Sequence, residues 1–242
     1  MSIEILAYEE TPLGILCLRR RSLVSKPEIE VTEVTLNHEF LMSSYLTESE
    51  RALSYFGLSG WGRANADKNL GTTKGKPGNL KAMVGGLGLG YTAMELLQSD
   101  LIAAVEVVEF LPQVIDWTKT GLTPLAEQLN SDPRLSITNA DVYAKLGASG
   151  NNDFDLILID VDHSPEDVLG EQSNQFYSSA GMEIAKSHLK PGGVIGIWSY
   201  AEYSPLIESM KEAFSDVSVE SVTVFNDLIH EDQTDWLFFG VN

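Results

Sequence analysis

The spacing of hydrophobic and polar positions changes near residue 80 and divides the chain into two parts. Before residue 37, apolar residues alternate with polar ones in three runs, near residues 3–7, 15–18 and 29–34. This alternation is typical of half-buried antiparallel strands. A helical pattern then follows Thr47, which has the spacing of a capping box with Glu50. We therefore expect residues 1–56 to form an N-terminal β-sheet appendage and a linking helix.

Residues 57–79 interrupt both patterns. The segment is rich in Gly, Asn, Lys and Pro and has few apolar residues, of which Trp61 is the largest. Such a composition indicates a connection between structured parts, and it is compatible with a lid. We expect a flexible connection here.

From residue 80 onward, short apolar runs alternate with helical patterns. The expected strands are 82–86, 102–108, 135–138, 155–160 and 193–198, and the expected helices are 91–99, 112–129, 141–147, 173–189 and 203–214. Two β-rich segments, 217–225 and 235–241, end the series. Repeated β–α units predict a parallel sheet with right-handed crossovers and a ligand at the carboxyl ends of its strands. Residues 80–242 are thus expected to form one α/β domain.

A cluster of glycines lies between the first of these strands and its helix. Its members are Gly85, Gly86, Gly88 and Gly90. Glycines permit positive φ values and the close approach of a ligand to the start of a helix, although a plain glycine-rich turn has the same composition. Glu109 lies about 20 residues further on, where a carboxylate accepts hydrogen bonds from a ribose in doubly wound folds. The pair predicts a nucleoside-containing cofactor.

The charge of the chain is unevenly distributed. There are 16 Lys and Arg against 35 Asp and Glu, which gives a net charge of −19. Residues 1–81 hold 10 of each sign, so the excess lies entirely in residues 82–242. An acidic surface repels nucleic acid and attracts cationic small molecules, and it also promotes solubility. We expect no nucleic-acid partner.

Cysteine content and apolar run lengths bear on the compartment. The single Cys17 cannot form an internal disulfide, which suits a reducing cytoplasm. No signal-peptide pattern and no apolar run of about 18 residues is found, so we expect a soluble cytoplasmic protein without membrane contact. No Cys/His cluster has the spacing of metal ligands, and we predict no metal.

Several motifs occur in the order seen in class I S-adenosylmethionine-dependent transferases. They are the glycine cluster, VVEFLPQV at 107–114, DPRLSITNAD at 132–141, DLILID at 155–160, FY at 176–177 and LKPGG at 189–193. More narrowly, the chain resembles the spermidine synthase family, which carries an N-terminal β-sheet and a Tyr-His-Glu-x-Leu motif similar to NHEFL at 37–41. The resemblance implies a Rossmann-like class I methyltransferase fold, in which a seven-stranded, mostly parallel sheet has antiparallel last strands. It also implies a homodimer or homotetramer.

The resemblance implies roles for individual residues. The four glycines would pass close to S-adenosylmethionine or its decarboxylated form, Glu109 would bind the ribose, and Asp141 would lie beside the adenine amino group. Asp160 would be the catalytic carboxylate at the end of the fourth strand.

The chemistry of amine transfer points to further polar residues near Asp160. An aliphatic amine is protonated in water, with a pKa of about 10.4, so a carboxylate must hold the ammonium and take its proton. Asp162 and His163 are candidates for this task beside Asp160. Binding of the acceptor is expected from Asp167 and Glu171, and from His38 and Glu39 in the appendage. The alternative for the segment after Asp160 is structural, since Ser164, Pro165 and the acids that follow suit the start of a helix.

Two departures from the spermidine synthase pattern affect the acceptor site. The glycine loop of that family contains an aspartate where this chain has Gly88, and the loop after Asp160 is one residue longer before its proline. Three functions therefore stay open. They are aminopropyl transfer from decarboxylated S-adenosylmethionine to a polyamine, methyl transfer from S-adenosylmethionine, and nucleoside binding without catalysis.

Overall fold

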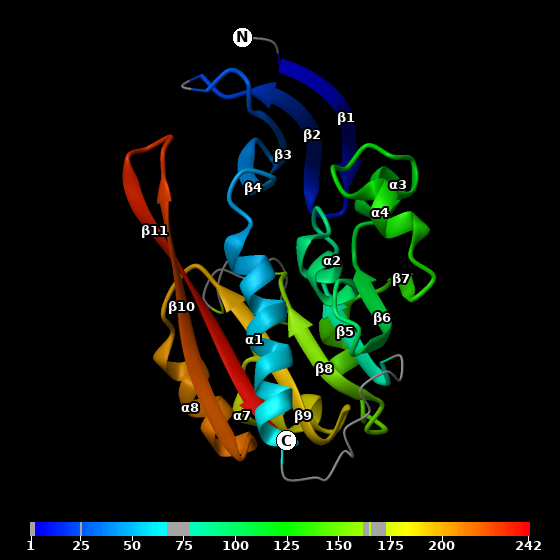
Figure 1. Cartoon of the computed structure of the whole chain (residues 1–242), viewed down its shortest axis with the longest axis vertical. Coiled ribbons are helices and arrows are strands. Elements are labelled where there is room, and N and C mark those ends of the chain that lie inside the picture. The colour runs from blue at the N-terminus through cyan, green and yellow to red at the C-terminus, as the bar shows by residue number, and fades with distance from the viewer. Residues whose placement is uncertain (1–2, 25, 67–77, 162–164, 166–172) are drawn as a thin grey trace.

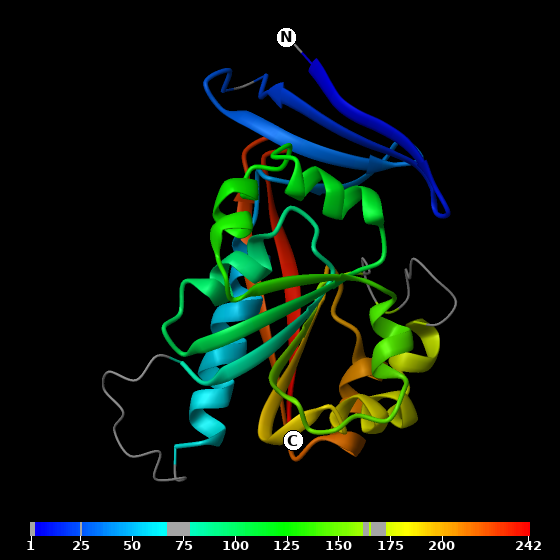
Figure 2. The same cartoon turned by 90° about the vertical axis from the view of Figure 1, so that its right-hand side faces the viewer.

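Two β-sheets organise the chain (Figure 1). The computed structural model describes residues 3–24, 26–66, 78–161, 165 and 173–242. The smaller sheet lies above the carboxyl ends of the parallel strands of the larger one, and helices cover both faces of the larger sheet (Figures 1 and 2).

The N-terminal sheet is an antiparallel meander in the order β1-β2-β3-β4. Its strands are β1 (Ile3–Thr11), β2 (Gly14–Ser22), β3 (Glu30–Leu36) and β4 (Glu39–Ser43). Asn37 and His38 have φ values of 52° and 72° and form the tight turn between β3 and β4. The sheet therefore has a fourth strand in addition to the three expected.

The larger sheet has the order β10-β11-β9-β8-β5-β6-β7. Its strands are β5 (Leu80–Gly85), β6 (Ile102–Glu109), β7 (Leu135–Asn139), β8 (Phe154–Ile159), β9 (Leu189–Ser199), β10 (Asp216–Asn226) and β11 (Glu231–Val241). β5 to β9 pair in parallel, whereas β11 pairs antiparallel with both β9 and β10. The predicted seven-stranded, mostly parallel α/β fold is confirmed.

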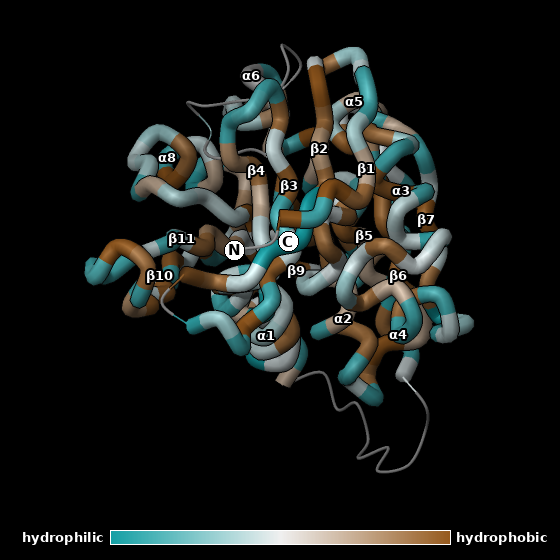
Figure 3. The backbone as a smooth tube through the Cα atoms, turned by 90° about the horizontal axis from the view of Figure 1, so that it is seen from above, coloured by the Kyte–Doolittle hydropathy of each residue, from teal (hydrophilic) through white to brown (hydrophobic). Residues whose placement is uncertain are grey.

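Two helical layers cover this sheet, one on each face (Figure 3). One layer holds α1 (Glu48–Ala64), α2 (Tyr91–Leu97), α3 (Pro112–Lys119) and α4 (Ala126–Ser131), and the other holds α5 (Val142–Leu146), α6 (Ser173–Phe176), α7 (Ser179–Lys186) and α8 (Ser204–Ala213). Successive side chains of a strand point to opposite faces, so Ala82 and Val84 pack in the first core and Met83 in the second.

Helix α1 begins where the sequence predicts but continues to Ala64, past the expected end at residue 56. The reason is the packing of its glycines. A Cβ atom on Gly57 would lie 3.0 Å from Leu158 Cδ2, so glycine lets the helix lie close to the sheet. The expectation of a connection from residue 57 is therefore wrong for residues 57–64, and residues 67–77 of that segment lie outside the described residues.

Two of the expected long helices are each divided in two. The helix expected over 112–129 is interrupted at Gly121, which has a φ of 85°, and at Pro124, so that α4 starts only at Ala126. The helix expected over 173–189 consists of α6 and α7. Within the described ranges, none of the helices combines the length and apolarity required to cross a membrane.

Candidate functional site

Two adjoining cavities lie between the N-terminal sheet and the carboxyl ends of the parallel strands. The smaller has a volume of about 160 Å³ and the larger about 540 Å³. Gly88 and Asp160 line both, and so do Leu41 and Met42 of β4. A molecule bound in one cavity would therefore meet a molecule bound in the other beside Asp160.

The glycine turn separates β5 from α2 and contributes to both cavities. Gly86, Gly88 and Gly90 have φ values of 91°, 51° and 94°, a region that favours glycine. A Cβ atom on Gly86 would lie 2.2 Å from the carbonyl oxygen of Asp160, so only glycine fits there. Gly86 and Gly88 line the smaller cavity, whereas Gly85 is packed under Val142 at the end of β5.

Glu109 lines the smaller cavity at the end of β6. Its Oε2 accepts a hydrogen bond from the Leu87 amide at 2.8 Å, and its Oε1 accepts one from the Leu111 amide at 2.7 Å. Burial raises the pKa of Glu109, and these backbone amides oppose that shift. The backbone amides of Gly88 and Phe110 also interact with this carboxylate and oppose the shift of its pKa.

Asp141 also lines the smaller cavity. It is the N-cap of α5, where its Oδ1 accepts hydrogen bonds from the amides of Tyr143 and Ala144 at 2.8 and 3.2 Å. The structure thus brings Asp141 to the same cavity as Glu109, with apolar walls from Val108 and Val142. Acidic groups at two points, apolar walls and the bare backbone of Gly86 and Gly88 fit a nucleoside.

Asp160 follows β8 and lies where the two cavities meet. Its Oδ2 accepts a hydrogen bond from Thr92 Oγ1 at 2.8 Å. Burial, together with the charge of Asp235, raises the pKa of Asp160 to about 6 although the Thr92 hydroxyl opposes the shift. A carboxylate with this pKa can accept and release a proton near neutrality.

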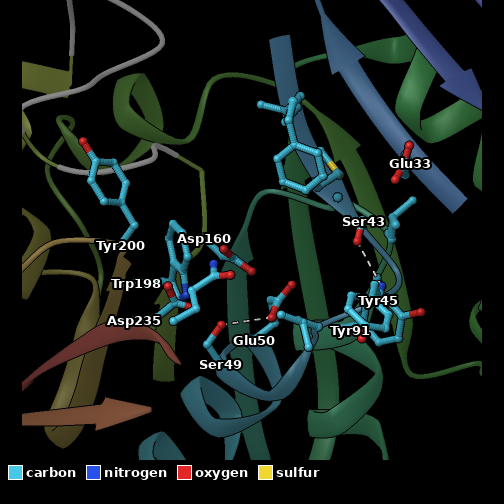
Figure 4. A pocket seen from close by; sticks show the side chains of 18 of the residues that line it. Glu33, Ser43, Tyr45, Ser49, Glu50, Tyr91, Asp160, Trp198, Tyr200 and Asp235 are labelled. Carbon is cyan, nitrogen blue, oxygen red and sulfur yellow. Dashed lines mark hydrogen bonds between the residues drawn. The ribbon is translucent and has the colours of Figure 1, made fainter. Parts of the chain in front are cut away.

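The larger cavity contains three carboxylates that the sequence did not assign to the site, Glu33, Glu50 and Asp235 (Figure 4). Glu33 forms ion pairs with Arg19 and Arg21. Glu50 lies in the first turn of α1, where Ser49 Oγ donates a hydrogen bond to its Oε2 at 3.1 Å. Burial and the charge of Asp160 raise the pKa of Glu50 to about 8. Burial also raises the pKa of Asp235, which is opposed in part by Ser49 and Trp198.

Glu50 was missed because its spacing from Thr47 predicts a capping box. In the structure the Thr47 amide donates instead to Glu48 Oε2 at 2.9 Å, and the Glu50 side chain faces the cavity. For Asp235 a signal did exist. An antiparallel last strand starts at the edge where parallel strands end, so the polar residue before its apolar run belongs at that edge.

The remaining predicted residues fall into two groups. His38 and Glu39 are exposed at the turn into β4, and neither lines the smaller or the larger cavity. Asp162, His163, Asp167 and Glu171 lie outside the described residues.

Tyr91, Trp198 and Tyr200 line the larger cavity. In the described part of the chain, no group of His, Cys, Asp and Glu is suited to hold a metal ion.

Comparison with curated proteins finds relatives of two kinds. Putrescine N-methyltransferase 4 from Nicotiana tabacum is 29% identical over 119 residues, which is 49% of this chain and 29% of that protein. The polyamine aminopropyltransferase from Nitrosomonas europaea is 31% identical over 139 residues, or 57% of this chain and 41% of that protein. The matched region thus spans less than half of either relative.

Comparison with solved structures supports the fold. A spermidine synthase from Thermotoga maritima matches with a TM-score of 0.71 and 13% identity, covering 98% of this chain and 72% of that one. A spermidine synthase in complex with the transition state analogue AdoDATO matches with a TM-score of 0.71 and 15% identity, covering 98% and 73%. At these identities the likeness concerns the fold alone.

The family model for the spermine/spermidine synthase domain matches residues 73–233. This range includes the glycine turn, Glu109, Asp141, Asp160 and the start of β11. It therefore covers most of the larger sheet and, apart from Asp235, the described residues of both cavities that lie beyond the N-terminal sheet and α1. The chain belongs to the spermine/spermidine synthase domain family.

Proposed function

We propose that this chain transfers an aminopropyl group from decarboxylated S-adenosylmethionine to an amine nitrogen of a polyamine. The observation that carries the proposal is the position of Asp160, the one catalytic candidate among the described residues that lines both the nucleoside cavity and the acidic cavity. Membership of the spermine/spermidine synthase domain family and the aminopropyltransferases among the relatives support it.

The proposed chemistry needs little from the protein beyond orientation and proton removal. A sulfonium donor in the smaller cavity would supply an electrophilic carbon and a neutral thioether as its leaving group. Asp160 would hold the acceptor ammonium beside the donor and take one proton from it, leaving a lone pair on the nitrogen. That lone pair forms the new C–N bond as the C–S bond breaks, and Asp160 then returns its proton to water.

Several residue roles stay predictions. Asp162 and His163 are proposed to assist Asp160, and Asp167 and Glu171 to contact the acceptor, all on the segment that follows β8 in the chain. We also propose that the chain acts in the cytoplasm and forms a homodimer or homotetramer. The single cysteine supports the first of these proposals, and exposed apolar residues on β1 support the second.

A second candidate is methyl transfer from S-adenosylmethionine. It is favoured by Gly88, which stands where the glycine loop of the aminopropyltransferases resembled here has an aspartate. A Cβ atom at this position would meet only Met42 Sδ, at 3.4 Å, so the space for that side chain is left to the donor. The putrescine N-methyltransferases among the relatives support the same candidate.

Calorimetric titration with S-adenosylmethionine, its decarboxylated form and methylthioadenosine separates these functions. Tighter binding of the decarboxylated form is expected for aminopropyl transfer, and tighter binding of the carboxylated form for methyl transfer. If none of the three binds, both transfer functions are excluded.

Replacement of Asp160 tests its role directly. Asp160→Asn keeps the shape of the side chain but removes the proton acceptor, so turnover should fall by about 10²- to 10⁴-fold. Donor affinity by calorimetry should stay within about twofold of the wild type. Asp153→Asn, at the exposed opposite end of β8, is the matched control and should keep full turnover. An active Asp160→Asn enzyme would remove Asp160 from the mechanism.

A further inference from the structure

The larger cavity has ends of opposite charge. Glu50, Asp160 and Asp235 form an acidic cluster at one end, and Glu33 with its two arginine partners lies on the far side of the cavity from Asp235 (Figure 4). Of the described residues that line this cavity, Arg21 is the only Lys, Arg or His. The binding of an amine gives this arginine no role.

Arg21 belongs to the run Arg19-Arg20-Arg21 of β2 and forms an ion pair with Glu33 of β3. The Glu33 side chain is buried, with an exposed fraction of 6%. Arg19 lies directly opposite Glu33 in the pairing of the two strands and donates from its Nε to Oε2 at 2.9 Å. Arg21 donates from its Nε to the other oxygen, Oε1, at 2.9 Å. Each carboxylate oxygen thus has an arginine of its own.

This Arg19–Glu33–Arg21 triad has a surplus of positive charge. Although burial opposes the shift, hydrogen bonds from Arg21 and Arg19 lower the pKa of Glu33, which therefore stays ionised near neutrality. Two guanidinium groups and one carboxylate carry a net charge of +1. Among the described residues, no second carboxylate forms an ion pair with either arginine. One positive charge is thus left for an anion from outside.

Arg21 also has hydrogen-bond donors left for that anion. A guanidinium carries five N–H groups in a planar fork. Arg21 donates to Glu33 from Nε and Nη2, so within the described part of the chain the N–H groups of Nη1 have no partner. The side chain is 20% exposed, and the residue lines the cavity. A planar fork with free donors suits a carboxylate.

The larger cavity has room for a charged group beside Arg21. Its volume is about 540 Å³, against about 160 Å³ for the smaller cavity, so a short aliphatic amine fills only part of it. Gly88 lines both cavities, and a Cβ atom there would meet only Met42 Sδ. The tail of a donor in the smaller cavity can therefore extend past Gly88 into the larger one. Both the donor tail and the acceptor have access to this space.

We propose that Arg21 binds a carboxylate in the larger cavity, so that one of the two molecules that meet beside Asp160 carries a carboxylate in addition to its ammonium group. This inference rests on the proposed function for the identity of donor and acceptor. The carboxylate can come from either molecule. An acceptor that carries it is compatible with aminopropyl transfer, whereas a carboxylate on the donor tail belongs to S-adenosylmethionine.

The test is calorimetric binding of two ligand pairs to the full chain, and the members of each pair differ by one carboxylate. The acceptor pair is 2,5-diaminopentanoate and butane-1,4-diamine, and the donor pair is S-adenosylmethionine and its decarboxylated form. In one of the pairs, the wild type should bind the carboxylated member at least about tenfold more tightly, because charge-assisted hydrogen bonds to a carboxylate are strong. Arg21→Gln should remove this preference and leave the affinity for the uncarboxylated member within about twofold.

Arg20→Gln is the matched control. Arg20 precedes Arg21 on the same strand, forms an ion pair with Glu30 and lines neither cavity, so its loss should change none of these affinities. In Arg21→Gln, Arg19 still pairs with Glu33, and circular dichroism checks that the variant folds. If it does not fold, Arg21→Lys keeps the charge without the fork and should lose part of the preference.

The pair that shows the preference identifies the source of the carboxylate. A preference within the acceptor pair assigns the carboxylate to the acceptor, and one within the donor pair assigns it to the donor. A wild type without a preference in either pair, or a preference that survives Arg21→Gln, would overturn the proposal. If the two uncarboxylated ligands then bind normally, the proposed function still stands, whereas a complete lack of binding would exclude both.

Discussion

Glu109 has a structural role and is proposed to bind the donor. Its oxygens accept the amide hydrogens of Leu87 and Leu111, which fixes the glycine turn against the end of β6. The residue also lines the smaller cavity, where we propose that the nucleoside binds. A change at this residue should therefore affect both the stability of the turn and the affinity for the donor.

Glu109→Gln tests both roles. An amide has one oxygen, so its NH₂ group would face a backbone donor, and the unfolding free energy should fall by about 1–3 kcal/mol. Affinity for methylthioadenosine should fall at least about tenfold. Urea unfolding and calorimetry measure the two effects. Glu106 lies on the same strand as Glu109 but interacts with Lys145 and Thr138, so Glu106→Gln should leave nucleoside affinity unchanged.

The acidic cluster makes the stability of the ligand-free protein depend on pH. Burial raises the pKa of Glu50 from 4.5 to about 8, and the pKa of Asp160 from 3.8 to about 6. The folded state thus holds these protons more tightly than the unfolded state. The two groups contribute their full stabilisation to the unfolding free energy below the pKa values of the unfolded state. This stabilisation is lost as the pH rises through the pKa values of the folded state.

Between about pH 5 and pH 8, the unfolding free energy should fall by an amount on the order of 2–4 kcal/mol. Urea unfolding across this range measures the decrease. Glu50→Gln should flatten the upper part of the curve, between pH 6 and 8, because the group that titrates there is gone. A wild-type protein that becomes more stable across the interval would contradict the assignment.

At the scale of elements, the glycine turn connects β5, α2 and the loop after β8. The Cβ of an alanine at position 86 would lie 2.2 Å from the Asp160 carbonyl oxygen, whereas at position 88 it would meet only Met42 Sδ. Both positions have positive φ values. An alanine is thus similarly strained at positions 86 and 88, but only at position 86 does its Cβ collide with the backbone.

Gly86→Ala should lower the unfolding free energy by about 3 kcal/mol or more, since strain and collision add. Gly88→Ala should cost about 1–2 kcal/mol, the strain alone. Thermal unfolding of the two variants in parallel measures the difference, and equal losses would show that the contact with Asp160 is not rigid. Gly86→Ala should also lower turnover more, because it displaces Asp160.

The sequence predicts the strands better than the helix ends, and glycine explains the difference. Buried parallel strands are continuous apolar runs, and all five were predicted to within a few residues. Gly57 lies inside a helix because the chain packs there against Leu158, whereas Gly121 ends one by taking a φ of 85°. The two glycines look alike in the sequence, since only their tertiary neighbours distinguish them.

At the scale of the whole molecule, the sequence predicted residues that line the smaller cavity but missed Glu50 and Asp235 of the larger one. The glycines, Glu109, Asp141 and Asp160 follow strands of one domain, so their order in the chain indicates a shared edge. Glu50 and Asp235 come from a helix before that domain and from its last strand. No local pattern links them, and the motif match at His38 instead marks a hairpin turn.

The open edge of the N-terminal sheet leads to a prediction about assembly. Among the described strands, β1 pairs with β2 alone, and its Ile3, Ile5 and Tyr8 are all more than half exposed. If copies of the chain associate through this edge, Ile5→Lys should shift the sedimentation coefficient toward that of the monomer. Tyr55→Lys, an equally exposed change on α1, should not. An unchanged assembly in Ile5→Lys would exclude this interface.

The ion pair between Lys26 and Asp227 joins the loop after β2 to the tip of the β10–β11 hairpin, 201 positions later in the chain. Asn226 and Leu228 of that tip line the larger cavity, whereas the last of the described residues that line the smaller cavity is Val161. During synthesis on the ribosome, the described residues of the smaller cavity therefore emerge before those that complete the larger one. A nascent chain thus contains the proposed donor site before the proposed acceptor site is complete.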